Sequence, residues 1–323
     1  MTLYDDGENI KLQKYIIAYI DILGTSSKLE ESENDFIKQI ESVYNALMWS
    51  LKKLKEETAF KSINPTYKIF SDNFILMIKD NENDETRKET ATFLSWLTLF
   101  QYMVTIKTGI LLRGSVDFGN MYVTDIFILG KPLVQVAKAE KNERLPRIIV
   151  NDIILKRMPE LGKEIITNKN YCIDGLKDDN KYYLNYFKWL DSSDDIFVNN
   201  FLTEIYADYN NEKTYQKTQW TRKYFIDMCK TKKLTFGRNG DIFVLCKKSC
   251  NSKSIDYYDS ILNKLHNINK NLFKKSIENE LISNNISYAA YDQSSDLSVE
   301  NEKRIIKLAQ ILRESMKEEH NDE

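Results

Sequence analysis

The sequence predicts an α+β fold, because strand and helix patterns follow one another in the order β-α-β-β-α-β-β-α-β over residues 13–152. Three observations support this order. Residues 15–22 form an apolar strand, residues 36–54 and 84–104 carry apolar side chains at helical spacing, and the other strands come in pairs closed by tight turns. This pattern is typical of an α+β fold rather than of a doubly wound one.

The first strand leads into a long helix and then into a hairpin. Ser32 is the candidate N-cap of the helix. Residues 64–70 and 73–79 read as two short strands around residues 71–73, whose composition Ser-Asp-Asn is typical of turns. The sequence therefore predicts a hairpin that carries an acid, Asp72, at its tip.

A second strand pair and a third helix follow the helix at 84–104. Residues 109–119 and 121–129 read as strands, and Gly119-Asn120 is the expected turn between them. Gly130-Lys131-Pro132 then opens a helix that continues to about Asn142. Residues 147–152 form the closing strand of the pattern.

The chain beyond this pattern has a different composition, rich in Lys, Asn, Asp and Tyr. Residues 177–191 include a candidate strand, and residues 234–248 a short hairpin. Residues 298–319 form an amphipathic helical stripe. We therefore expect a catalytic domain over residues 13–152 and a mostly helical, α-rich C-terminal extension over residues 153–323.

Composition excludes several classes of partner. The 323 residues carry 46 basic and 48 acidic side chains, so nothing favours nucleic acid or an anionic membrane. No apolar run approaches the ~20 residues of a membrane helix, and the N-terminus does not resemble a signal peptide. The four cysteines are scattered and indicate reduced thiols rather than a zinc site. We expect a cytoplasmic protein.

The histidine content limits the chemistry further. The chain has two histidines, His266 and His320, and both lie in polar sequence. Histidine-based hydrolases and most zinc enzymes are therefore disfavoured. Catalysis has to depend on carboxylates, on Lys and Arg, and on backbone amides.

Two acids lie at points where strands end. Asp21 closes the apolar first strand, and Asp72 lies at the tip of the hairpin. Two carboxylates at one sheet edge repel each other unless a cation lies between them, and Mg²⁺ or Mn²⁺ prefers such oxygen ligands together with phosphates. The loop at residues 23–26 leads toward a helix, and its amides suit a phosphate group. The alternatives are a structural acid at Asp21 and an ordinary turn residue at Asp72.

These motifs together resemble one family. Four motifs occur in the order found in the class III nucleotide cyclases. They are YIDILGTS at 19–26, KIFSDNFIL at 68–76, LLRGSVDFG at 111–119 and DIFILGKPLVQVAKAE at 125–140. The resemblance covers residues 13–152 and is greatest to the Pycsar antiphage cyclases, which make cyclic UMP or cyclic CMP. It implies a ferredoxin-like cyclase core.

The resemblance also implies roles for individual residues. Asp21 and Asp72 match the two metal aspartates, and Ile22 matches the residue whose carbonyl also reaches a metal. The phosphate loop corresponds to Leu23, Gly24, Thr25 and Ser26. The implied cofactors are two divalent ions, Mn²⁺ or Mg²⁺, and the implied reaction closes a nucleoside triphosphate to its 3′,5′-cyclic monophosphate with release of pyrophosphate.

The base pocket is expected on the strand that precedes Asp72. Lys68 stands where purine cyclases place a base-reading residue, and its ammonium suits a carbonyl oxygen of uracil or cytosine. Tyr67 and Phe70 are expected to narrow the pocket. We therefore expect UTP as the substrate, then CTP.

The third helix departs from the family. Val134 and Lys138 stand where purine cyclases have Asn and Arg, and a register shifted by one gives Gln135 and Ala139. Lys138 is expected to act on the partner's site as a point charge without the guanidinium fork. Arg113 is expected to take over part of this role.

Two other charged residues have open alternatives. Arg113 contacts either the substrate phosphates or one of two acids, Asp117 and Asp125. Glu140 is expected at the surface or in a dimer contact.

Family resemblance implies a homodimer with sites at the interface and a separate cyclic-nucleotide effector in antiviral defence. Two other functions stay open: a polymerase that makes cyclic oligonucleotides, and a nucleotide-binding sensor without turnover. The hairpin tip Phe-Ser-Asp-Asn counts against the polymerase, which usually carries a GGDD-like hairpin.

Overall fold

The protein is described here by a computed structural model. The residues that it describes are 12–25, 29, 32–56, 63–80, 84–162, 164–171, 179–191, 201–202, 205, 212–239 and 242–247. The chain divides into two compact units, and residues 1–190 with 219–224 make up the first. The expected helix at 298–319, both histidines and Ser26 lie outside the described residues.

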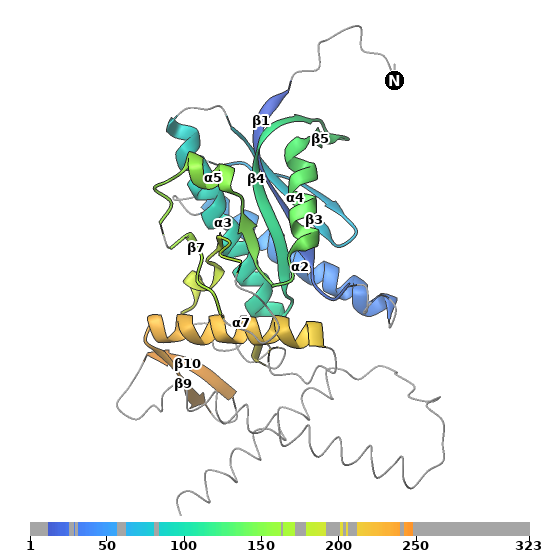
Figure 1. The fold of residues 1–323 in the computed structure, drawn as a ribbon. Helices are drawn as coiled ribbons and strands as arrows, with labels where there is room; N and C mark the ends of the chain where they lie inside the picture. Colours follow the sequence, from blue (N-terminus) through green and yellow to red (C-terminus); the bar gives the residue numbers. More distant parts are fainter. Residues whose placement is uncertain are drawn as a thin grey trace, which may run out of the picture. The chain divides into compact units, whose positions relative to one another are not determined.

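The strands of the first unit form one mixed sheet (Figure 1). In sheet order they are β2 (Thr66–Phe70), β3 (Asn73–Asp80), β1 (Gln13–Ile22), β4 (Leu112–Val123), β6 (Ile148–Val150), β8 (Tyr183–Leu184) and β7 (Ile166–Thr167), and β5 (Ile128–Gly130) pairs with β4. β1 is antiparallel to both β3 and β4, and β6 is parallel to β4. The fold is therefore α+β, as predicted.

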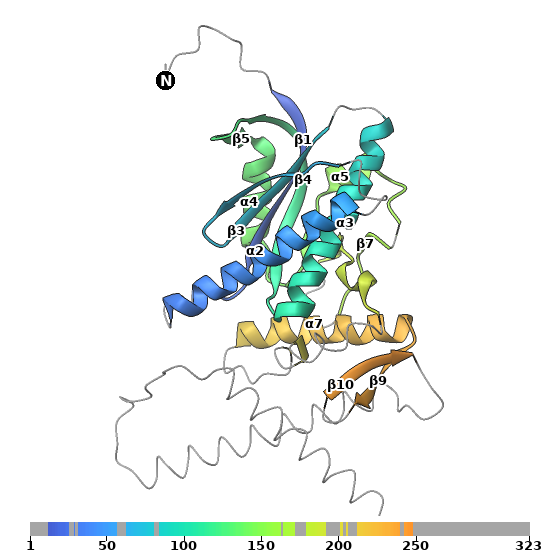
Figure 2. The same ribbon diagram turned by 180° about the vertical axis from the view of Figure 1, so that it is seen from behind.

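Helices cover both faces of this sheet. On one face lie α2 (Glu33–Glu56) and α3 (Asp84–Thr108), and on the other lies α4 (Lys131–Asn142) (Figures 1 and 2). Two short helices, α5 (Asp152–Arg157) and η2 (Tyr186–Trp189), follow later in the chain. The long helices begin and end within a few residues of their predicted limits, because apolar spacing and capping residues identify them directly.

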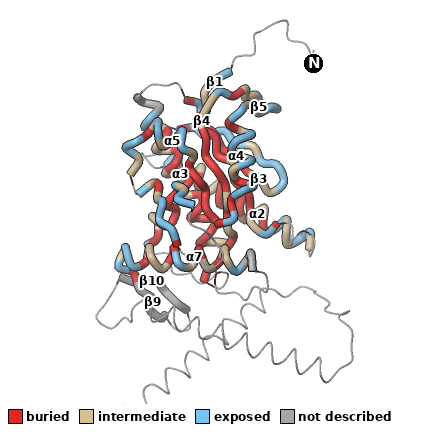
Figure 3. Tube along the Cα trace, viewed as in Figure 1, coloured by how far each residue is buried: buried red, intermediate tan, exposed pale blue. Residues whose placement is uncertain are grey.

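The strand β1 supplies side chains to two cores, because alternate residues of a strand point to opposite faces. Ile16 and Ile20 are fully buried in the core under α2 and α3. Ile17 is fully buried on the other face, where it packs with Val136 of α4. Figure 3 shows this burial as a continuous red centre in the sheet. The odd-numbered residues of β1 therefore face α4.

The helix α2 begins as predicted. The Ser32 hydroxyl accepts a hydrogen bond from the Asp35 amide at 3.3 Å, which makes Ser32 the N-cap. Acids occupy the first turn and lysines the last turn, so the charges complement the helix dipole.

The predicted turn at Gly119-Asn120 is wrong. β4 runs without a break from Leu112 to Val123, and the turn lies at residues 124–127, where the Thr124 amide donates to the Phe127 carbonyl at 2.8 Å. Pairing with β1 extends to Met121 and carries the strand through the glycine. A Cβ at Gly119 would lie 2.8 Å from Cγ of Pro132, so close approach to α4 rather than a turn requires glycine here.

The later part of the chain contributes to both units. The sheet continues beyond residue 152 through β7 and β8. The middle of α7 (Glu212–Thr231), residues 219–224, belongs to the first unit. In the second unit, β9 (Leu234–Asn239) and β10 (Ile242–Lys247) form the predicted hairpin. Among the described residues, no helix has the length and apolar character needed to cross a bilayer.

Candidate active site

Asp21 lies at the end of β1, on the sheet face that α4 covers. In the strand registers it stands between Asn73 of β3 and Arg113 of β4. Its 8% exposed surface shows a carboxylate that is largely removed from water. A buried carboxylate needs a cation or several hydrogen bonds, and this need decides the chemistry of the site.

Arg113 supplies the positive charge that faces Asp21. Its Nε donates to Asp21 Oδ2 at 2.9 Å, and its Nη2 lies 2.9 Å from the same oxygen. Its Nη1 donates to the Glu143 carbonyl at 3.2 Å. Of the open alternatives for Arg113, the structure therefore shows an ion pair, but with Asp21 rather than with Asp117 or Asp125.

The second acid, Asp72, is brought to the end of β1 by the hairpin turn. The Ile22 amide donates to the Asp72 carbonyl at 3.3 Å, which ties the turn to the end of β1. The Asp72 carboxylate accepts the Thr25 hydroxyl at 2.5 Å and the Asn73 side-chain amide at 3.0 Å. Asp21 and Asp72 therefore meet at one edge of the sheet, as predicted from their positions at strand ends.

Burial raises the pKa of Asp21 from its ordinary 3.8 to about 7. The Arg113 guanidinium opposes this rise, whereas the nearby carboxylates of Glu140 and Asp72 add to it. The raised pKa means that the buried site, without a further cation, disfavours the ionised form of Asp21. A cation entering beside these carboxylates would lower the pKa of Asp21 and would be bound in return.

The loop after Asp21 has the backbone geometry of a tight turn. Gly24 has φ +87°, and a Cβ there would meet no atom within 4 Å, so conformation rather than space favours glycine. The Leu23 amide donates to the Leu111 carbonyl at 2.9 Å, so it is used within the fold. Four loop residues are predicted to bind phosphate, and Ser26 lies outside the described residues. The amides of Gly24 and Thr25 are therefore the candidates for binding a phosphate group.

The oxygen donors here suit a hard divalent cation. Three oxygen groups come from adjoining strand ends: the carboxylates of Asp21 and Asp72 and the carbonyl of Ile22. The Ile22 carbonyl also accepts the Thr25 hydroxyl at 3.3 Å. Mg²⁺ and Mn²⁺ bind through one or two carboxylates and complete their shells with water and phosphate oxygens. In the described residues, no larger cluster of three or more His, Cys, Asp or Glu ligands occurs. The residues present fit Mg²⁺ or Mn²⁺ that arrives with a phosphate ligand.

The three residues expected to form the base pocket lie on two different faces of β2. Lys68 pairs with Ile75 and Tyr67 with Leu76, and neighbouring residues of a strand face opposite ways. Ile75 packs on the α4 side and Leu76 in the opposite core. Lys68 and Phe70 therefore share the face of Asp21, whereas Tyr67 does not, and Tyr67 cannot line the same side of a pocket. The Lys68 ammonium donates to the Asp125 carbonyl in the turn between β4 and β5.

Lys138 lies away from the site within its own chain. Val136 and Glu140 point toward the sheet and are buried, whereas Val134 and Lys138 are exposed. A step of two residues turns a helix by roughly 200°, so Lys138 is on the outer side of α4. The structure does not bring Lys138 to Asp21 of the same chain.

The prediction for Glu140 as a surface residue is wrong. Its side chain is 7% exposed, and its Oε1 lies 2.6 Å from Nε of Arg113. The signal was present in the spacing, because Leu133, Val136 and Glu140 form one inward stripe of α4. The charge of Glu140 predicts a surface position, but its place on that stripe buries it.

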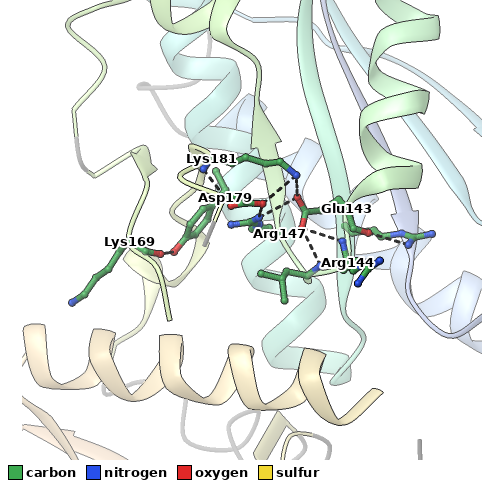
Figure 4. A network of polar contacts seen from close by, with 9 residues as sticks. Glu143, Arg144, Arg147, Lys169, Asp179 and Lys181 are labelled. Carbon is green, nitrogen blue, oxygen red and sulfur yellow. Dashed lines mark hydrogen bonds and ion pairs between the residues drawn. The ribbon is translucent and has the colours of Figure 1, made fainter. Parts of the chain in front are cut away.

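A polar network holds the end of α4 and the carbonyl that Arg113 contacts (Figure 4). The Glu143 carboxylate accepts hydrogen bonds from Arg147 at 3.2 Å, from Lys181 at 3.1 Å and from the amides of residues 144–145. Asp179 lies 2.5 Å from Arg147 and 3.2 Å from Lys181. Glu143 and Arg147 are nearly inaccessible to water. The network therefore gives Arg113 a fixed acceptor at one end of its guanidinium.

Comparison with known proteins gives structural matches only. No protein-family model and no curated protein matches the sequence. The adenylyl cyclase CyaB from P. aeruginosa is 14% identical over 54% of this chain and 94% of its own, with a TM-score of 0.39. The catalytic core of a rhodopsin-guanylyl cyclase with converted specificity, bound to ATPαS, is 14% identical over 54% and 95%, with a TM-score of 0.37.

A third match, a class III adenylyl cyclase-like ATP-binding protein from Pseudomonas aeruginosa, is 13% identical over 45% of this chain and 34% of its own, with a TM-score of 0.35. All three TM-scores lie below 0.5, so these similarities do not assign the chain to a family.

Proposed function

We propose that this protein is a nucleotidyl cyclase that converts a nucleoside triphosphate to its 3′,5′-cyclic monophosphate and pyrophosphate. The observation that carries the proposal is the meeting of Asp21 and Asp72 at one sheet edge, beside the Gly24 turn and Arg113. Carboxylates that hold divalent cations, next to amides and a guanidinium that face phosphates, are the equipment for phosphoryl chemistry.

Each residue has a distinct part in this proposal. Asp21, Asp72 and the Ile22 carbonyl would hold two divalent ions, Mn²⁺ or Mg²⁺, which when bound lower the pKa of the ribose 3′-hydroxyl and neutralise the triphosphate. The amides of Gly24 and Thr25 bind phosphate oxygens at the loop. Arg113 adds a positive charge beside the phosphates, where charge develops as pyrophosphate leaves.

The exposed position of Lys138 supports a homodimer. Lys138 is on the outer side of α4, so a role for it in catalysis requires the site of another chain. A head-to-tail pair gives two equivalent sites, each completed by the partner's lysine. Exposed apolar side chains on neighbouring elements, including Ile126, Phe127, Leu129 and Val134, are suited to this contact.

The choice of base is part of the proposal. Lys68 and Phe70 share the site face of β2, and a lysine donor beside an aromatic ring suits a pyrimidine with a carbonyl oxygen. We propose UTP first and CTP second. The proposed setting is cytoplasmic signalling in antiphage defence through a separate effector, which follows from the resemblance of the sequence motifs.

Two observations favour a second function. Val134 is 53% exposed where purine cyclases have an amide, and Asp21 is engaged by Arg113. A protein that binds a triphosphate through the same residues without turnover would have these features. A product assay distinguishes such a sensor from a cyclase.

The test is a product assay with each ribonucleoside triphosphate and Mn²⁺, resolved by mass spectrometry. Asp21→Asn and Asp72→Asn remove the carboxylate charge without changing size, and Glu41→Gln on the exposed side of α2 is the matched control. A cyclic mononucleotide that both site variants abolish and the control retains supports the cyclase. Oligonucleotide products would support a polymerase, and triphosphate binding without any product would support the sensor.

A further inference from the structure

Glu140 places a second carboxylate beside Arg113. Its Oε1 lies 2.6 Å from Arg113 Nε, and the residue is 7% exposed. Arg113 therefore lies against two buried carboxylates, Asp21 and Glu140, of which the proposed reaction uses only Asp21.

Hydrogen-bond geometry distinguishes the two acids. Nε of a guanidinium carries one hydrogen, and Arg113 directs it to Asp21 Oδ2 at 2.9 Å. Glu140 Oε1 is buried at ion-pair distance from the same nitrogen, yet it accepts no hydrogen bond from the described residues. A buried acceptor without a donor is costly. Glu140 therefore offers Arg113 a second place to bind.

The other end of the guanidinium is fixed. Nη1 donates to the Glu143 carbonyl, and the Glu143 side chain is held by Arg147, Lys181 and two amides. A guanidinium held at Nη1 can redirect its Nε–H by a small rotation about that contact. It needs no movement of the strand that carries it.

Under the proposed function, two cations bind to the Asp21 carboxylate. Its carboxylate binds Arg113 in this structure, and the same carboxylate would bind a divalent ion. Sharing with a divalent ion weakens Asp21 as an acceptor for Arg113, which then needs another anion. A partly buried guanidinium without an anionic partner is costly.

We propose that Glu140 is a positioning residue, which receives the Arg113 guanidinium from Asp21 when a divalent cation binds at Asp21 and Asp72. This inference rests on the metal site of the proposed function. The exchange keeps Arg113 paired throughout and keeps its charge beside the place where phosphates bind. Glu140 thereby makes metal loading less costly and holds Arg113 ready for the triphosphate.

The test measures Mn²⁺ binding to the full chain without nucleotide, by the electron paramagnetic resonance signal of free Mn²⁺. Glu140→Gln keeps the shape and loses the charge, so Arg113 has only Asp21 left. We expect the Kd for Mn²⁺ to rise about tenfold. Arg113→Gln removes the competing cation and is expected to lower the Kd. Glu41→Gln is the surface control and leaves it unchanged.

The double variant Arg113→Gln/Glu140→Gln separates action through Arg113 from direct attraction of the cation. If Glu140 acts through Arg113, adding Glu140→Gln to the Arg113→Gln protein changes the Kd by less than about twofold. An equal loss of affinity in both backgrounds would show direct attraction and overturn the inference. Unchanged Mn²⁺ affinity in Glu140→Gln alone would overturn it as well.

Failure of the proposed function has a different signature. If Asp21→Asn binds Mn²⁺ as wild type does, the metal site itself is wrong. If Asp21→Asn loses binding but Glu140→Gln does not, only the present inference fails.

A measurement on the unmutated protein covers the case in which a variant misfolds. The Arg113 Nε–H resonance, identified by its loss in Arg113→Lys, is expected to shift when Mg²⁺ is added and to stay protected from exchange with water. An unchanged resonance, or one that broadens into exchange with water, would contradict transfer to Glu140.

Discussion

The raised pKa of Asp21 predicts an unusual pH dependence of stability for the metal-free protein. At low pH the carboxyl group is protonated in both the folded and the unfolded chain and contributes nothing. Between its ordinary pKa of 3.8 and its folded value of about 7, the folded chain keeps a proton that the unfolded chain has lost. The free energy of unfolding therefore falls as pH rises through this range.

The size of the effect follows from the same values. At 1.36 kcal/mol per pH unit, the proton retained by Asp21 in the folded chain would lower the free energy of unfolding by at most about 2.7 kcal/mol between about pH 5 and about pH 7. Some contact of the carboxylate with water reduces this cost, and we expect about 2 kcal/mol. Asp21→Asn carries no charge at any pH, so the dependence on pH should be correspondingly flatter in that variant.

The assay is denaturant unfolding in EDTA at a series of pH values, followed by tryptophan fluorescence. All four tryptophans, Trp49, Trp96, Trp189 and Trp220, belong to the first unit, so the signal reports the unit that holds Asp21. The quantity compared is the difference between wild type and Asp21→Asn. Burial also raises the pKa of Asp117, but that residue is present in both proteins and cancels. A difference that does not change with pH, or that has the opposite sign, would refute the reasoning.

Three more predictions concern the loop, the dimer and the base. Gly24→Ala forces φ +87° on a residue with a Cβ, so stability should fall by about 1 kcal/mol in the same unfolding assay, and triphosphate affinity should fall in a binding titration; unchanged values would exclude a required turn. Asp21→Asn and Lys138→Ala should each be inactive, whereas their equal mixture should recover about a quarter of wild-type activity if each site uses both chains; no recovery would place Lys138 outside the site. Lys68→Ala should reduce the preference for UTP and CTP over ATP by about tenfold in competition assays, because adenine has no carbonyl oxygen for the ammonium, and a retained preference would remove Lys68 from base recognition.

Local signals in the sequence predicted most of the elements that build the site. Ser32 as an N-cap and the acid-tipped turn at Asp72 depend on neighbours within a few residues, and both appear where predicted. The turn assigned to Gly119-Asn120 failed for the opposite reason. A glycine followed by asparagine has turn chemistry, but pairing with β1 holds these residues in a strand, and contact with Pro132 explains the glycine.

The sequence by itself determined the kinds and order of the elements and the two acids at strand ends, because periodicity and turn chemistry are local properties. Only the tertiary structure decided which charges meet. Arg113 and Asp21 are 92 residues apart in the chain, and the register of β4 against β1 makes them neighbours. The same register and the inward stripe of α4 bury Glu140 beside them, and strand alternation turns Tyr67 away. Such pairings depend on which strand lies beside which, and no local pattern specifies that.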